Sequence, residues 1–196
     1  EDWLGDADTR DPGVPHGPHD PVLLLYTSGT TGTPKGVMLT HESHGYSGEV
    51  AKAWDFNPAR VNLVAMPLFH IGGLGYGMMG MSQGGHTVLI QQPDPALVMD
   101  LIERCHVTHA LFVPTVIQAL VEHAEQHPAS LSSFRRMVYG AAPIGEELLR
   151  RAMSVFQCAF THAYGLTESS GTVVTLQPED HDPDGPLKSR LRSCGK

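Results

Sequence analysis

Residues 26–36 read Tyr26-Thr27-Ser28-Gly29-Thr30-Thr31-Gly32-Thr33-Pro34-Lys35-Gly36 and lie between two apolar runs, 22–25 and 37–40. Glycines let a backbone approach a ligand closely and turn its N–H groups toward an anion. Four hydroxyl groups add hydrogen-bond donors, Lys35 adds a compact positive charge, and the loop contains no acid. A glycine-rich surface turn is the simpler alternative, but a turn requires neither a lysine nor four hydroxyls. The segment therefore predicts a buried strand followed by a loop that binds a polyphosphate.

The order of residues in this loop differs from that of a Walker A loop. The Walker A pattern places a glycine and a lysine five and six positions after its first glycine. Counted from Gly29, Pro34 occupies the place of the second glycine, and Gly36 follows Lys35. The loop is therefore a different type of phosphate-binding loop.

Composition excludes several classes of protein. With 41% hydrophobic and 17% charged residues among 196, the chain is globular rather than disordered. Its net charge of 13 − 21 = −8 argues against nucleic acid or an anionic membrane as the main partner. Three distant cysteines, Cys105, Cys158 and Cys194, fit a reducing compartment better than a disulfide framework. We find no signal peptide, and prolines and glycines break the longest apolar tract, 61–81, so we expect a cytoplasmic protein without a transmembrane segment.

Strand and helix patterns alternate along the chain. Short apolar runs predict strands at 22–25, 61–66, 87–90, 110–113, 137–139 and 159–162. Helical spacing predicts helices at 42–55, 95–104, 115–126 and 145–156, with Thr115 capping the third. This alternation predicts an α/β fold with a largely parallel sheet flanked by helices. We expect an irregular lead-in at 1–21, the α/β unit at 22–177 and a polar tail at 178–196.

Four polar or glycine-rich loops follow predicted strands. They span 27–35, 67–73, 140–143 and 164–168. Ligands of open α/β sheets gather outside the carboxyl ends of the strands. We therefore expect all four loops at one edge of one sheet, where they would form a single site.

The segment after the second predicted strand combines His70 with many glycines. Glycines at 73, 77, 80 and 84 fall on one helical face, although each glycine in a helix costs about 1 kcal/mol relative to alanine. Such a face admits either a packed backbone or a ligand, and spacing alone leaves both open. No acid lies between Arg60 and Asp94, so a buried α-ammonium group would lack a partner, and we disfavour an amino-acid substrate.

Two other patterns carry less weight. Residues 75–80 fit G-x-G-x-x-G, but no strand leads directly into the first glycine and no acid follows the next strand. The histidine pairs His41/His44, His106/His109 and His123/His127 lack a third ligand at zinc spacing, so they predict ordinary surface or packing histidines.

The loop at 27–36 and the segment Tyr164-Gly165-Leu166-Thr167-Glu168 together carry a family resemblance. Both resemble signatures of the adenylate-forming superfamily, which comprises acyl-CoA synthetases and other AMP-dependent synthetases and ligases, luciferases and nonribosomal-peptide adenylation domains. The segment 66–70 resembles the stretch leading to the acyl pocket in acyl-CoA synthetases. The resemblance extends from about Val22 to Lys196 and identifies the chain as a central fragment of the large N-terminal domain.

The resemblance implies roles for individual residues. The loop would hold the β- and γ-phosphates of ATP, Tyr164 would stack on adenine, Thr167 would bond the α-phosphate, Glu168 would hold Mg²⁺, and His70 would gate the acyl channel. The residues implied in catalysis are Lys35, His70, Thr167 and Glu168. Those implied in nucleotide binding are Thr27, Ser28, Gly29, Thr30, Thr31, Gly32, Lys35, Gly140, Ala141, Ala142, Pro143, Tyr164, Gly165 and Thr167.

The resemblance also implies a reaction. A fatty or aryl carboxylate would attack the α-phosphate of MgATP, and coenzyme A thiol would then displace AMP. Family members are more than twice as long and carry a mobile C-terminal domain, so we expect this piece alone to be inactive. Two alternatives stay open: transfer of the acyl group to a carrier-protein thiol, and a non-catalytic nucleotide-binding module.

Overall fold

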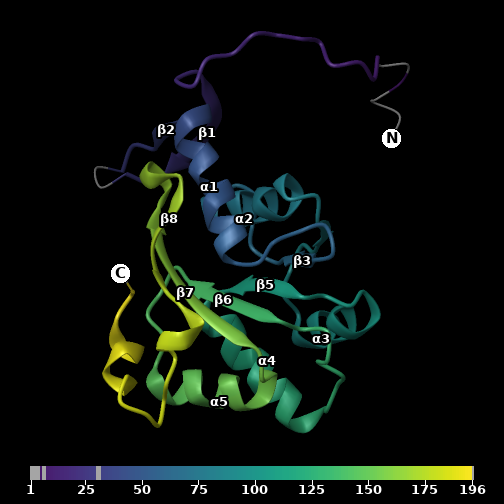
Figure 1. Cartoon of the computed structure of the whole chain (residues 1–196), viewed down its shortest axis with the longest axis vertical. Coiled ribbons are helices and arrows are strands. Elements are labelled where there is room, and N and C mark those ends of the chain that lie inside the picture. Colours follow the sequence, from purple (N-terminus) through teal and green to yellow (C-terminus); the bar gives the residue numbers. More distant parts are fainter. Residues whose placement is uncertain (1–4, 6–7, 30–31, 196) are drawn as a thin grey trace.

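A twisted six-stranded sheet forms the centre of the molecule (Figure 1). The computed structural model describes residues 5, 8–29 and 32–195, so Thr30 and Thr31 lie outside the described residues. The strand order is β4-β3-β5-β6-β7-β8, in which neighbours from β4 to β7 run parallel and β8 runs antiparallel to β7. The strands are β3 (Val61–Val64), β4 (His86–Leu89), β5 (His109–Phe112), β6 (Arg136–Gly140), β7 (Ala159–Leu166) and β8 (Gly171–Leu176). The predicted α/β class with a largely parallel sheet is confirmed.

Helices cover both faces of this sheet (Figure 1). One face carries α3 (Pro95–Arg104), α4 (Pro114–Gln126) and α5 (Glu146–Phe156), and the other carries α1 (His41–Ala53) and α2 (Ile71–Ser82). Successive residues of a strand point to opposite faces, so Met137 and Tyr139 join the larger core while Val138 joins the smaller one. Burial on both faces explains why these strands read as continuous apolar runs. Among the described residues, no helix has both the length and the apolar character that crossing a bilayer requires.

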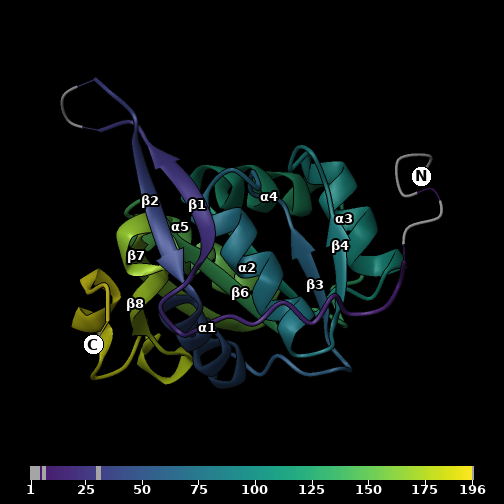
Figure 2. The ribbon, with the colours of Figure 1, turned by 90° about the horizontal axis from the view of Figure 1, so that it is seen from above.

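The first two strands pair with each other rather than with the main sheet. β1 (Pro21–Thr27) and β2 (Lys35–Thr40) form an antiparallel hairpin that reaches beyond the body of the molecule (Figure 2). The prediction that loop 27–35 shares a sheet edge with the other three loops was wrong. The run 22–25 also predicted a buried strand, yet only Leu25 is fully buried, and Leu24 is 55% exposed. An apolar run does not reveal which strand it pairs with, and this pairing leaves one face of the hairpin uncovered.

The strand after α5 is longer than predicted and has an additional partner. β7 continues to Leu166, so Tyr164 and Gly165 belong to a strand and not to the loop after it. Its partner β8 (Gly171–Leu176) was not predicted, although Thr172, Val173, Val174 and Thr175 are β-branched residues that favour strands. The predicted cap Thr115 was also wrong: α4 begins at Pro114 with Val113 as its N-cap, since proline suits the first helical position.

The glycine face of α2 packs against the protein itself. A Cβ added at Gly73 would overlap the carbonyl oxygens of Pro67 and Met66, and one at Gly80 would lie 2.9 Å from Asn62 Nδ2. Asn62 Nδ2 also donates to the carbonyl oxygen of Tyr76 at 3.2 Å. Gly73 and Gly80 therefore bring α2 close to the protein backbone around β3, as the packing alternative predicted. Gly84 was wrongly placed on this face, because α2 ends at Ser82.

A buried histidine links β5 to the end of α1. The side chain of His109 is fully buried, and its Nε2 donates to the carbonyl oxygen of Trp54 at 3.0 Å. Burial lowers the pKa of His109 to about 4. Since the unfolded chain binds this proton near pH 6.5, the folded state loses stability as the pH falls from 6.5 toward 4.

Acidification should therefore weaken the fold. Between pH 7 and pH 5, we expect His109 to lower the free energy of unfolding by about 2 kcal/mol, measured by urea unfolding at both values. The variant His109→Gln should lose most of this difference, whatever its stability at pH 7. His86→Gln, a change at the exposed start of β4, should keep it. An equal pH difference in wild type and His109→Gln would contradict the assignment.

Candidate active site

Two cavities adjoin the carboxyl ends of the parallel strands. The first, here called the apolar pocket, has a volume of about 290 Å³, and the second, here called the tail-side pocket, about 420 Å³. Ala141, Ala163 and Gly165 line both cavities, so the end of β7 forms a wall between them. This position agrees with the general location of ligands in open α/β sheets. Loops 67–73, 140–143 and 164–168 therefore share one edge, as predicted, and only loop 27–35 lies on the separate hairpin.

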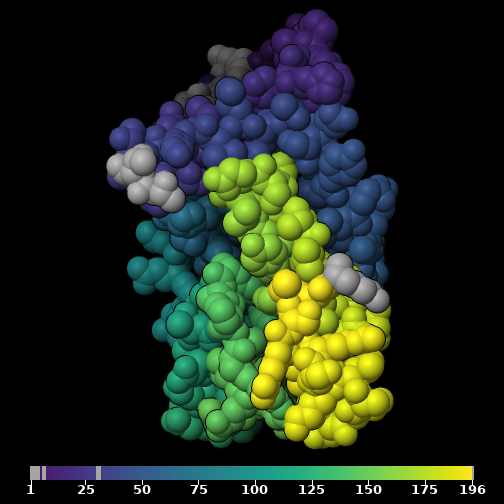
Figure 3. Space-filling model, turned by 90° about the vertical axis from the view of Figure 1, so that its left-hand side faces the viewer, coloured from purple at the N-terminus to yellow at the C-terminus, as the bar shows by residue number. Residues whose placement is uncertain are grey.

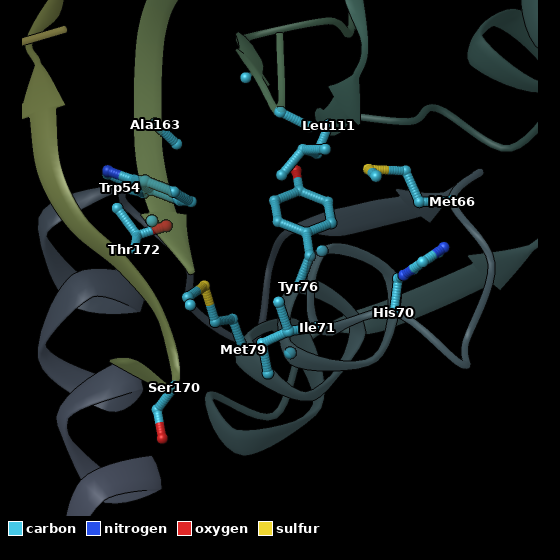
Figure 4. A pocket seen from close by; sticks show the side chains of 16 residues that line it. Trp54, Met66, His70, Ile71, Tyr76, Met79, Leu111, Ala163, Ser170 and Thr172 are labelled. Atoms are coloured by element: carbon cyan, nitrogen blue, oxygen red, sulfur yellow. The ribbon is translucent and has the colours of Figure 1, made fainter. Parts of the chain in front are cut away.

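Aromatic, thioether and glycine residues form most of the apolar pocket (Figure 4). Trp54 and Tyr76 are 1% and 3% exposed, and their ring centroids lie 6.5 Å apart. His70 is exposed and lines the same cavity, so it stands at the mouth. His70 is the N-cap of α2 but makes no side-chain capping bond, and its ring lies 4.7 Å from that of Phe69. Loop 67–73 therefore places a polar side chain, that of His70, at the entrance of an apolar cavity.

The tail-side pocket joins β6 and β7 to the C-terminal segment. The predicted residues Ala141, Ala142, Pro143, Tyr164 and Gly165 all line it. A Cβ on Gly140 would overlap the carbonyl oxygen of Ala163, so the turn at 140–143 has no room for a side chain at this position. Ala141 has a φ of +62°, a conformation that costs about 1 kcal/mol or more for a residue with a side chain. Tyr164 is 47% exposed, which leaves aromatic surface available for a planar base.

A short turn places Thr167 and Glu168 between β7 and β8. Residues Thr167–Ser169 form the 3-10 helix η1, which lies beside β2. Ser169 Oγ accepts from the N–H of Leu166 at 3.1 Å, and Ser170 Oγ donates to Ser43 Oγ on α1 at 3.1 Å. These bonds hold the turn, while Glu168 remains exposed and forms no ion pair with a described cation. A free carboxylate at a rigid turn is a suitable ligand for a hard cation.

Strand β2, which follows the hairpin loop, lies beside this turn. Gly29 and Gly32 have φ values of +61° and +82°, which a glycine adopts without strain. A Cβ on Gly29 would overlap the carbonyl oxygen of Thr33, so the loop requires glycine there. Lys35 is exposed at the start of β2, and Thr27 is half-buried at the end of β1. Figure 3 shows η1 and the start of β8, in lime, on one face between the hairpin and the yellow C-terminal segment.

Several residues at the two cavities were missed by sequence reasoning. Trp54, Tyr76 and Thr172 line the apolar pocket, and His162 and Arg192 line the tail-side pocket. The sequence contained a signal for His162. It precedes Tyr164 by two residues on a strand, and this spacing places both side chains on one face. Trp54 had none, because it follows α1 and reaches the cavity only through the packing of that helix.

His162, which lines the tail-side pocket, has a buried ring nitrogen, Nδ1, without a hydrogen-bond partner among the described residues. Its ring stacks on Tyr139 with centroids 4.8 Å apart. Burial lowers the pKa of His162, so the ring is neutral at pH 7. No group of three histidine, cysteine or acidic side chains in the described part of the chain could hold a metal ion.

A largely parallel α/β sheet with two adjoining cavities at its carboxyl edge has the general form of a ligand-binding α/β domain. The model of the family described as AMP-binding enzyme matches residues 1–196. The chain belongs to this family.

Individual relatives agree with the family match. The chain is 36% identical over 180 residues to a fatty acid–[acyl-carrier-protein] ligase, ScoC, from Streptomyces coeruleorubidus, covering 87% of this chain and 35% of that protein. It is 38% identical to a feruloyl-CoA synthase from an Amycolatopsis species, covering 88% of this chain and 35% of the relative.

A solved structure has the same fold. O-succinylbenzoate coenzyme A synthetase from Bacillus subtilis, in complex with ATP and a magnesium ion, matches with a TM-score of 0.70 and 34% identity, covering 81% of this chain and 33% of that one. The chain therefore spans about a third of the length of the relatives that it matches.

Proposed function

We propose that this chain is the nucleotide- and acid-binding part of an acid–thiol ligase that forms AMP. The observation that carries the proposal is the wall at the end of β7, which separates an apolar pocket for the acid from a second pocket for the nucleotide. Relatives named as CoA synthases and an acyl-carrier-protein ligase support the reaction class. We assign the binding unit to residues 22–177, with 1–21 as a lead-in and 178–196 as a tail that leads to a further subdomain.

The proposed reaction has two steps. A carboxylate oxygen of the acid attacks the α-phosphorus of ATP, and the bond from that phosphorus to the bridging oxygen breaks, which releases pyrophosphate and leaves an acyl-adenylate. The thiolate sulfur of coenzyme A then attacks the acyl carbon, and AMP departs. Both steps depend mainly on positioning the reactants and stabilising charge at phosphorus.

The described residues have distinct proposed roles. Lys35 donates to the leaving pyrophosphate together with Thr27, Ser28 and the backbone at Gly29 and Gly32, and Thr30 and Thr31 of the same loop complete this set. Thr167 donates to the α-phosphate, and His70 orients the acid at the mouth of the apolar pocket. The adenine lies on the small turn Gly140-Ala141-Ala142-Pro143, where Gly165 leaves space beside the base, and the ring of Tyr164 stacks on it.

Glu168 is the proposed metal residue. Its carboxylate is exposed and unpaired with any described cation, and Mg²⁺ commonly binds one or two carboxylates together with phosphate oxygens. The ion, when bound, neutralises charge on the phosphates. The solved relative that contains ATP and a magnesium ion supports this use of the fold.

The acceptor thiol has two candidates. Coenzyme A is favoured by the feruloyl-CoA synthase relative, whereas the ScoC relative is named for an acyl-carrier protein. Dependence of thioester formation on added coenzyme A distinguishes them. Because the relatives are about three times as long, we also propose that residues 1–196 alone do not turn over.

Carboxylate-dependent exchange of labelled pyrophosphate into ATP tests the proposed function. The full-length protein should exchange label with fatty or aryl acids and not with amino acids. Binding of ATP without exchange for any acid would favour a non-catalytic nucleotide-binding module instead.

Replacement of the loop lysine should abolish most of this exchange. Removal of one preorganised donor from such a site typically lowers the rate about a hundredfold to a thousandfold, and we expect this for Lys35→Ala. The control is Lys52→Ala on α1, where an exposed lysine pairs with Glu49 at 2.8 Å. It should stay within about twofold of wild type, since surface ion pairs contribute little. Similar rates for the two variants would refute the assigned role of Lys35.

A further inference from the structure

A hydrogen bond between two serine hydroxyls joins segments that lie 127 positions apart in the chain. Ser170 Oγ donates to Ser43 Oγ at 3.1 Å. Ser170 directly follows η1, the turn that carries Thr167 and Glu168, and Ser43 lies in the first turn of α1, directly after β2. The bond therefore connects the turn with the proposed α-phosphate and metal residues to the strand that begins at Lys35.

The hydroxyl of Ser43 uses its full hydrogen-bonding capacity. It accepts from the backbone N–H of Thr40 at 3.0 Å and donates to the carbonyl oxygen of Thr40 at 3.1 Å. Because a serine hydroxyl has one donor and two acceptor positions, the acceptor position that remains takes the proton of Ser170. Thr40 is both the last residue of β2 and the N-cap of α1, so Ser43 ties Ser170 to the junction between these two elements.

The other end of this link is also fixed. Ser170 is 8% exposed, and its backbone N–H donates to the carbonyl oxygen of Thr167 at 3.1 Å. Its φ of +59° is a conformation that a residue with a side chain keeps only where the surrounding contacts hold it. In Figure 4 the hydroxyl of Ser170 points away from the other labelled side chains of the apolar pocket. This hydroxyl therefore serves the link to α1 and not the pocket.

We propose that Ser43 and Ser170 are positioning residues that keep loop 27–35 and η1 aligned during adenylate formation. The proposal rests on the proposed function, in which Lys35 binds the leaving pyrophosphate and Thr167 binds the α-phosphate. The two sides of the breaking bond are then held by segments far apart in the chain, and η1 lies beside β2 where the serine link acts. Misplacement of such groups by about 1 Å can lower a rate a hundredfold.

The kinetics of pyrophosphate exchange in the full-length protein test this proposal. Ser43→Ala and Ser170→Ala should each lower kcat by about tenfold or more, with KM for ATP within about threefold of wild type, because each phosphate keeps its donors and only their alignment changes. Of the two serines, only Ser170 lines a described cavity. A similar loss in both variants therefore identifies their shared bond as the cause.

A double variant and a matched control complete the test. The two substitutions break the same bond, so the variant with both should keep about the kcat of either single variant. Thr40→Ala removes the bond from the Ser43 N–H to Thr40 Oγ1, and so weakens the same helix cap, but it leaves all three bonds of the Ser43 hydroxyl. It should keep kcat within about twofold of wild type, because a cap contributes to stability and not to this alignment.

Three results would overturn the proposal. The first is a wild-type kcat in either single variant, the second is a double variant in which the two losses multiply, and the third is a loss in Thr40→Ala as large as that in Ser43→Ala. In each case the wild-type protein still exchanges label with some acid, so the proposed function survives. Absence of exchange by the wild-type protein with every acid would instead remove the proposed function, and this inference with it.

Discussion

Replacement of Gly165 by alanine should destabilise the protein and abolish its activity together. A Cβ at this position would overlap the Gly171 carbonyl oxygen and lie 2.8 Å from Thr172 Cα, so backbone rather than a flexible side chain must move. Overpacking of this kind typically costs about 1–3 kcal/mol and sometimes more, and we expect about 2–4 kcal/mol here. Urea unfolding of wild type and Gly165→Ala measures the loss.

The loss of activity should exceed what unfolding explains. Gly165 lines both cavities, and it pairs with Thr172 at the irregular end of the β7–β8 ladder. A shift there also moves η1, which carries Thr167 and Glu168. Misplacement of catalytic groups by about 1 Å can lower a rate a hundredfold, so we expect at least this decrease in pyrophosphate exchange under conditions where the variant is folded.

Gly45→Ala is a control variant for which we expect the free energy of unfolding to change in the opposite direction. It lies exposed inside α1, and no atom comes within 4 Å of a Cβ built on it. Gly45→Ala should therefore stabilise the protein by about 0.5–1 kcal/mol, since alanine is the better helix former, and leave the exchange rate unchanged. Equal stability for Gly165→Ala and wild type would show that the β7–β8 turn tolerates a side chain and would contradict the close packing.

Replacement of Glu168 by glutamine should remove activity without affecting the fold. The side chain is exposed and lies in η1, whose bonds come from Ser169 and Ser170, so the amide changes no described contact. Loss of the carboxylate would remove a ligand of Mg²⁺ and with it the stabilisation of charge on the phosphates. We expect pyrophosphate exchange to fall about a hundredfold to a thousandfold.

The dependence on magnesium identifies the cause of this loss. In Glu168→Gln, the Mg²⁺ concentration that gives half-maximal exchange should rise, while the thermal midpoint stays within about 1 °C of wild type. Glu103→Gln is the matched control, because Glu103 is exposed on α3 away from both cavities. A variant that keeps both the wild-type rate and the wild-type Mg²⁺ dependence would show that Glu168 does not hold the metal.

These two changes act on one structural unit, the sequence β7–η1–β8. Gly165 sets the shape of the wall between the pockets, and four residues later the bonds of Ser169 and Ser170 hold the turn. The unit also contacts β2, so it connects the hairpin loop to the main sheet. Residues far apart in the chain therefore meet around a short and rigid segment, which suits a site that depends on positioning.

Local elements could be predicted well from sequence. The helix at Pro95–Arg104 has its predicted bounds, because Asp94 caps it and the proline begins it. The helix that starts after Gly145 also ends at Phe156 as predicted. Strand pairing was harder to predict: β1 and β2 form their own hairpin, and β8 was missed although its sequence is rich in β-branched residues. Pairing depends on contacts between residues distant in the chain, which hydrophobic periodicity does not contain.

The sequence by itself determined the fold class and the chemical motifs. Glycines, hydroxyls and Lys35 in the loop at 27–36 predict phosphate binding from residue type and spacing, whereas the roles of Thr167 and Glu168 are implied by the family resemblance. The tertiary structure decided which groups surround the ligand pockets. Trp54 follows α1, Tyr76 lies in α2 and His162 lies in β7. Only packing of those elements places these three residues, each with a buried atom that has no partner among the described residues, around the pockets. The physical reason is that burial and the absence of a hydrogen-bond partner are properties of the folded surroundings, whereas the capacity to donate or accept belongs to the residue.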